Sequence, residues 1–71
     1  MRTSDLSTAA IHRLIEKAGA GRVGDGAVES LKGVLENMAL QISKDAIDFA
    51  SHAGRRTIRA EDIKLAAKRF L

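Results

Sequence analysis

Apolar residues recur every three or four positions along most of this chain, in stretches separated by glycines. This spacing predicts helices, because side chains three and four positions apart lie on one face of a helix. The first helix is expected over about residues 7–18, with Ser7 as its N-cap and Gly19 just beyond its end. Further helices are expected over about 25–53 and about 60–70, so the predicted fold class is all-α.

The two connections are expected over about residues 19–24 and 54–59. Glycines crowd the first, and both contain β-branched residues, which favour extended backbone. A residue or two of extended chain is therefore expected in each, at Val23 and at Thr57 and Ile58. A chain this short is expected to form a single domain, residues 1–71.

The central helix has an apolar face over its whole length, formed by Val28, Leu31, Leu35, Met38, Ile42, Ala46, Phe49 and Ala53. A thinner stripe of Leu40 and Ile47 lies on roughly the opposite side. A helix of about 28 residues is about 42 Å long, which two short helices cannot cover. A second copy that crosses this helix would cover both stripes, so the pattern predicts an obligate dimer.

Composition leads to the same expectation. Hydrophobic residues make up 45% of the chain, but many are alanine, and a core this light offsets the entropy of folding poorly. The chain has no cysteine, and His12 and His52 lie too far apart for a common metal-binding spacing, so no disulfide, metal or cofactor is expected. Its apolar runs are too short for a membrane span or a signal peptide, so we expect a soluble, intracellular protein.

The net charge of +3 is unevenly distributed. The long helix is acidic overall, whereas residues 51–71 carry six basic side chains against two acidic ones. Seven of the 12 basic residues are arginine, whose planar fork suits phosphate, and the loops contain Arg22, Arg55, Arg56 and Arg59. A solvated surface is the alternative interpretation. With only two aromatic residues, base stacking on single strands or RNA is not favoured, so duplex DNA is the better target.

Two stretches resemble archaeal histones, and the similarity covers nearly the whole chain. His52 to Ile63 is similar to the family signature through the second loop and into the last helix, and Lys17 to Ala20 with Arg22-Val23 resembles the first loop. The resemblance implies the histone fold: an intertwined handshake homodimer in which each first loop lies beside the partner's second loop. It also implies a chromosome-associated cytoplasmic protein that binds double-stranded DNA with little dependence on sequence. Such a protein bends, wraps and thereby compacts the DNA.

The resemblance also implies roles for individual residues. Arg22 matches a first-loop arginine that enters the minor groove, Arg56 and Thr57 match a phosphate-binding pair, and Arg13 matches a first-helix arginine near the backbone. Lys17, Arg2 and Arg59 would add accessory charge. Arg55 and Asp62 match a salt bridge that braces the second loop against the last helix. For each DNA-binding residue the alternative is an ordinary solvated or loop-capping side chain.

Four residues fall where family dimers meet in a four-helix contact: Phe49, His52, Asp62 and Leu65. Dimers are therefore expected to form tetramers or longer assemblies on DNA. Phe49 and Leu65 could equally be dimer core, and His52 could simply stabilise the end of its helix. Gly19 matches a glycine that lets turns of a histone–DNA superhelix stack, or it serves only as a helix C-cap.

Departures from the family pattern point to a weaker binder or a different assembly size. Gly24, with Gly26 beside it, stands where a serine often begins the long helix, and Leu40 occupies a position that is more polar in familiar members. The main alternative function is a histone-fold module that heterodimerises within a transcription or other complex. An enzyme is not expected, because no activated nucleophile or phosphate-cradling loop is present. No small-molecule substrate or membrane partner is expected either.

Overall fold

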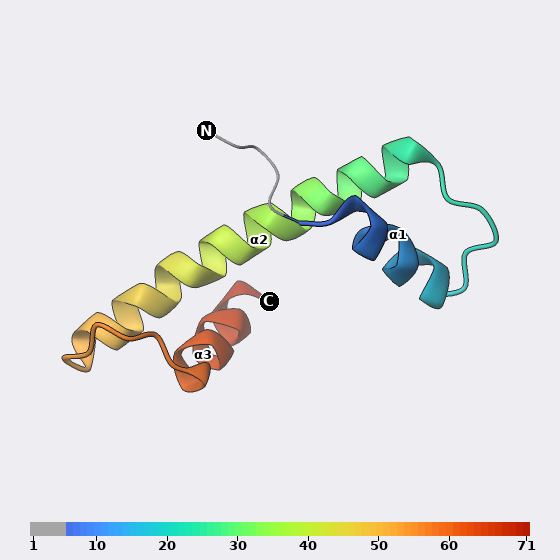
Figure 1. Cartoon of the computed structure of the whole chain (residues 1–71). Helices are drawn as coiled ribbons and strands as arrows, with labels where there is room; N and C mark the ends of the chain where they lie inside the picture. The colour runs from blue at the N-terminus through green and yellow to red at the C-terminus, as the bar shows by residue number, and fades with distance from the viewer. Residues whose placement is uncertain (1–5) are drawn as a thin grey trace. The chain divides into compact units, whose positions relative to one another are not determined.

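A computed structural model describes residues 6–71 and contains three helices. They are α1 (Thr8–Lys17), α2 (Asp25–His52) and α3 (Ala60–Phe70), joined by two loops (Figure 1). Their bounds differ from the expected ones by at most one residue at each end. No strand occurs within the described part of the chain, so the extended residues expected at Val23, Thr57 and Ile58 form no sheet.

Local side-chain and backbone chemistry explains where the helices begin and end. Ser7 is the N-cap of α1, and its hydroxyl accepts a hydrogen bond from the Ala10 amide at 3.2 Å. Gly19 follows α1 with a φ of +112° and Gly54 follows α2 with a φ of +74°. Residues that have a side chain rarely adopt this left-handed backbone region. Glycine adopts it readily and therefore ends both helices without strain.

The described residues divide into two compact units, with the boundary between Asn37 and Met38. In the first unit α1 packs on the first half of α2, and Ile11 and Val28 are its buried apolar residues. Lys32 is also buried there, and its ammonium contacts α1. The first unit therefore has a very small apolar core that includes a charged side chain.

The second unit contains the last half of α2, the second loop and α3. Its buried apolar residues are all alanine: Ala46 and Ala50 of α2 and Ala66 of α3. Small side chains let two helices approach closely, but they remove little apolar area from water. Phe49 is half-buried beneath Arg69, whose guanidinium carbon lies 5.6 Å from the ring centroid.

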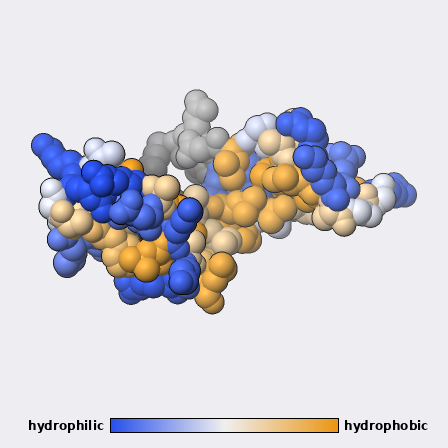
Figure 2. All heavy atoms as spheres, turned by 90° about the horizontal axis from the view of Figure 1, so that it is seen from below, coloured by the Kyte–Doolittle hydropathy of each residue, from blue (hydrophilic) through white to orange (hydrophobic). Residues whose placement is uncertain are grey.

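Each unit leaves large apolar side chains exposed, as the orange patches in Figure 2 show. On α2 the expected apolar face is buried at Val28 and Ala46 and half-buried at Leu31, Leu35, Met38, Ile42 and Phe49. Ala53, which is also expected on that face, is exposed and lies in the turn after α2. Because contiguous exposed apolar surface marks an interaction site, these faces are suited to cover by another chain.

Candidate nucleic-acid interface

The first loop, residues 18–24, presents Arg22 to solvent next to half-buried Val23. The loop leads into α2 through Gly24, whose carbonyl accepts hydrogen bonds from the amides of Ala27 and Val28 at 3.0 and 3.3 Å. Gly24 has no side chain that could cap the other free amides at this helix end. The site of Arg22 is therefore an exposed loop followed by a helix start without a side-chain cap.

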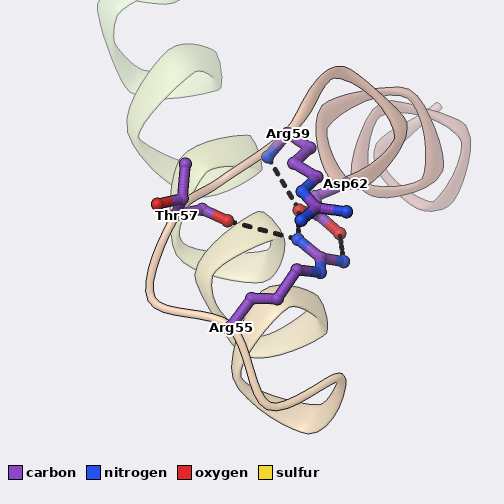
Figure 3. A network of polar contacts seen from close by, with 4 residues as sticks. All are labelled: Arg55, Thr57, Arg59 and Asp62. Carbon is purple, nitrogen blue, oxygen red and sulfur yellow. Dashed lines mark hydrogen bonds and ion pairs between the residues drawn. The ribbon is translucent and has the colours of Figure 1, made fainter.

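The second loop, residues 53–59, is organised by an ion pair between Arg55 and Asp62 (Figure 3). Arg55 Nη1 donates to Asp62 Oδ2 at 2.8 Å and Nη2 donates to Oδ1 at 3.0 Å, a two-pronged contact. The Arg59 amide also donates to Oδ2 at 2.8 Å, and Arg55 Nη1 reaches the Thr57 carbonyl at 3.2 Å. This salt bridge, which the resemblance implied, joins the loop to the first turn of α3.

The ion pair shifts the titration of both partners. The hydrogen bond from Arg55, reinforced by the Arg59 amide, lowers the pKa of Asp62 from 3.8 to about 2. The same hydrogen bond raises the pKa of Arg55 above its ordinary value. Asp62 is only 4% exposed, so its carboxylate stabilises the loop and is not a surface charge.

The residues expected to touch phosphate lie on the outside of this braced loop. Arg56 and Thr57 are both exposed, and the Thr57 side chain points away from the ion pair in Figure 3. Arg59 is the N-cap residue of α3 and is exposed. A groove beside the loop is lined by Ile47, Ala50, Ser51, Arg55, Arg56 and Ile58. The second loop therefore presents an arginine and a hydroxyl on a braced backbone.

The remaining expected DNA contacts belong to the first unit. Arg13 and Lys17 are exposed on α1, with Lys17 in its last turn. Arg2 lies outside the described residues. The basic side chains expected to contact DNA are thus exposed in both units, on α1 and in the two loops.

Three of the four residues expected between dimers are accessible to different degrees. His52 is exposed at the end of α2, and its Nδ1–H donates to the Asp48 carbonyl at 2.8 Å. Leu65 is 48% exposed on α3, and Phe49 is half-buried. Asp62 differs from them, because it is buried and both its oxygens already accept hydrogen bonds from its own loop. A histidine from another dimer would have to share this carboxylate with Arg55.

Residues 5–67 match the family described as histone-like transcription factor (CBF/NF-Y) and archaeal histone. The chain belongs to this family. It is 49% identical over 65 residues to one of the subunits of archaeal histone HAN1 from Thermococcus zilligii, a match that covers 92% of this chain and 97% of the relative. It is 38% identical over 65 residues to probable archaeal histone 3 of Methanocaldococcus jannaschii, with the same coverage.

The similarity extends to eukaryotic histones. The chain is 33% identical over 64 residues to histone H4 of Dictyostelium discoideum, a match that covers 90% of this chain and 59% of the H4 chain. Membership in the family gives the chain the histone fold and, in general terms, the role of a DNA-binding chromatin protein.

Neither a metal site nor a membrane span occurs in the part of the chain that the structure describes. Across residues 6–71, no three His, Cys, Asp or Glu side chains come together to hold a metal ion. No helix in that range combines the length and the apolar character needed to cross a bilayer.

Sequence reasoning missed one cluster in this histone-fold chain. Lys32 and Glu36 contact the start of α1, although neither is among the expected functional residues. The signal available in the sequence is a lysine one turn after Val28, on the face expected to be apolar. A charged residue at such a position indicates either a break in the face or a specific buried contact.

Proposed function

We propose that this chain binds double-stranded DNA as a dimer, with little dependence on base sequence, and that it bends, wraps and compacts the duplex. The observation that carries the proposal is the second loop. Its backbone is fixed by the Arg55–Asp62 ion pair, while Arg56 and Thr57 are exposed beside it. A fixed backbone with an outward arginine and hydroxyl matches the donors that position proteins on phosphates.

The distribution of charge supports duplex DNA as the ligand. Arg22 and Arg56 lie in loops of different units, and arginine suits both phosphates and a narrow minor groove. Arg13 on α1 would add a further backbone contact, with accessory charge from Lys17, Arg59 and, outside the described residues, Arg2. Contacts of this kind carry no base readout, so affinity depends on phosphate neutralisation and on how easily the duplex bends.

A homodimer explains the exposed apolar side chains. Val34 in the first unit and Ile47 in the second are each more than half exposed, which a second copy would cover. In the handshake arrangement the partner's first loop would lie beside the second loop, where the groove that includes Ile47 and Ile58 offers an apolar surface. One dimer would then present two paired-loop sites to the DNA.

We further propose that dimers associate on DNA into tetramers or longer assemblies, through Phe49, His52, Asp62 and Leu65. In such an assembly Gly19 would allow successive turns to stack. The protein would reside on the chromosome in the cytoplasm, without catalytic activity or cofactor.

A second candidate is a module that pairs with a different histone-fold chain. The matched family includes histone-like transcription factors, and one relative is named as a subunit. The mass of the isolated chain in solution separates the two candidates. A folded dimer of the pure chain supports the homodimer, and an unfolded monomer supports the heterodimer module.

The direct test replaces the two loop arginines, as Arg22→Ala with Arg56→Ala. Because each dimer loses four cations, the slope of log affinity against log salt should become shallower by about 3 to 4. Affinity should fall to a similar degree for duplexes of unrelated sequence. Fluorescence anisotropy of labelled duplexes across a salt series measures both quantities.

The matched control is Lys44→Ala with Lys64→Ala, which removes the same charge from exposed positions on α2 and α3. The control should change the slope much less than the loop variant does. Equal effects of the two variants would mean that only net charge matters, and unchanged binding by the loop variant would overturn the site assignment.

A further inference from the structure

Lys32 is a charged residue at a position where an apolar one would be expected. It follows Val28 by one helical turn, and only 9% of its surface is exposed. Burial of an ammonium group is unfavourable unless the group is paired and hydrogen-bonded. A methionine would fill similar space without the cost of burying a charge. The presence of lysine therefore indicates a polar contact that an apolar side chain cannot make.

That contact is with the first residue of α1. Lys32 Nζ donates a hydrogen bond to Thr8 Oγ1 at 3.0 Å, across 24 positions of sequence. Lys32 also forms a longer ion pair with Glu29 of the same helix, at 3.7 Å, and the Glu29 side chain is 64% exposed. Because this ion pair is long and its carboxylate partner is exposed, it adds little, and the bond to Thr8 is the specific contact of this ammonium.

Glu36 makes a second contact one turn further along α2. Its Oε2 accepts a hydrogen bond from the Leu6 amide at 3.2 Å. Leu6 and Thr8 flank Ser7, the N-cap of α1. Two residues of α2 therefore bind the chain on both sides of this N-cap, and they fix the beginning of α1 on the first half of α2.

Among residues 6–71, no side-chain hydrogen bond or ion pair joins the other end of α1 to α2. This end leads into the first loop, where residues 19–22 are exposed and two of the four are glycine. The direction of α1 therefore depends on the contacts at its beginning, together with the burial of Ile11.

We propose that Lys32 is a positioning residue for DNA binding: it fixes the beginning of α1 through Thr8, so that Arg13 and the first turn of α1 meet the phosphate backbone in a preformed orientation. This inference rests on the proposed function. Lys32 itself is not proposed to touch DNA, because its side chain is only 11% exposed and its ammonium is hydrogen-bonded to Thr8 of α1. Preorganisation of this kind raises affinity by avoiding the cost of ordering on binding.

The test uses Lys32→Met and Thr8→Val, which each keep the side-chain volume and remove one partner of the hydrogen bond. Each variant should bind a 30-base-pair duplex about three- to tenfold more weakly, the range expected for the net free energy of one hydrogen bond. The salt slope should stay at the value of the parent. If Lys32 contacted a phosphate directly, the salt slope of Lys32→Met would become shallower by about 0.9 per lysine. That result would overturn the positioning role.

The double variant separates coupling from two independent losses. Lys32→Met with Thr8→Val should bind no more weakly than either single variant, because both remove the same interaction. Thr8→Ser, which keeps the hydroxyl, should bind like the parent. Lys44→Met removes a lysine from an exposed position of α2 and should leave affinity within twofold. Additive losses, or failure of the serine to rescue, would overturn the inference.

Hydrogen exchange of the free protein gives a second measurement that does not involve DNA. The Ile11 amide donates to the Ser7 carbonyl at 3.1 Å, in the first turn that Lys32 is proposed to fix. Its exchange should accelerate in both single variants and stay slow in Thr8→Ser. Unchanged exchange and unchanged affinity in Lys32→Met would remove the positioning role. If the parent does not bind duplex DNA, the proposed function itself fails.

Discussion

Asp62 is the residue on which the second loop depends. Its carboxylate binds the Arg55 guanidinium through two hydrogen bonds and accepts a third from the Arg59 amide. These contacts favour the ionised form and give the group a pKa of about 2 in the folded protein, against 3.8 ordinarily. A group whose pKa is lower in the folded state stabilises the fold above its unfolded pKa and loses this contribution as the pH falls.

The stabilisation from Asp62 should therefore be complete above about pH 4 and disappear as the pH falls towards 2. Asp62→Asn should lower the unfolding temperature at pH 7 and flatten its dependence on pH over this interval. Thermal unfolding followed by circular dichroism from pH 2 to pH 7 measures both effects. Asp48→Asn, at an exposed position, is the matched control and should leave the profile of the parent intact.

An unchanged pH profile in Asp62→Asn would show that the ion pair does not contribute to folding. Asp62 is also one of the residues proposed to join dimers. Because the two oxygens are occupied within the chain, the proposed contact of His52 from another dimer with this residue would require the loop to be already folded.

At the scale of the helix, glycine has opposite effects at different positions. Gly33 lies inside α2, and a methyl group added there would meet no atom within 4 Å. Gly54 has the same open space, but its φ of +74° lies in the left-handed region. Replacement of glycine by alanine should therefore stabilise the protein at position 33 and destabilise it at position 54.

Gly33→Ala should raise the free energy of unfolding by about 1 kcal/mol per chain, because alanine favours the helix interior. Gly54→Ala should lower it by about 1 to 2 kcal/mol per chain, the cost of a left-handed conformation. Urea unfolding at one fixed protein concentration compares the two variants directly. A destabilised Gly33→Ala would indicate that a partner chain contacts α2 at this point.

The helices could be predicted from sequence because their signals are local. Apolar periodicity, the Ser7 cap and the glycines at 19 and 54 act within a few residues of each helix end. The buried contact of Lys32 could not be predicted in this way, since its partner Thr8 lies 24 positions away. The Arg55–Asp62 pair was expected from the family resemblance alone, because a separation of seven residues across a loop specifies no contact.

At the scale of the whole molecule, the core is too small for the exposed apolar surface that surrounds it. Within residues 6–71 the buried apolar side chains are Ile11, Val28, Ala46, Ala50 and Ala66, and three of these are alanine. Val34 and Ile47 of α2 are 53% and 52% exposed. A second copy that covers them would supply the apolar area that each unit lacks.

Val34→Ser and Ile47→Ser test this cover. If the chain were monomeric, substitutions at such exposed positions would change stability by no more than about 0.5 kcal/mol. In a dimer each should cost about 1 to 3 kcal/mol per chain, the range for uncovering a buried apolar side chain. Sedimentation equilibrium should show weaker dimers, and the unfolding temperature should vary with protein concentration.

Gln41→Ser, at an exposed polar position of the same helix, is the control and should leave the dimer intact. If all three variants behave like the parent, neither apolar position lies in a dimer interface. A monomeric parent that remains folded would contradict the homodimer itself.

The absence of proline from these glycine turns affects how quickly this protein recovers from denaturation. Helices α1 and α2 are each followed by a glycine turn, and the sequence contains no proline. Slow cis–trans isomerisation, which delays the refolding of many proteins by tens of seconds or more, is essentially a property of prolyl bonds. Refolding of a heated or diluted population should therefore lack the slow phase that prolyl isomerisation causes in other proteins.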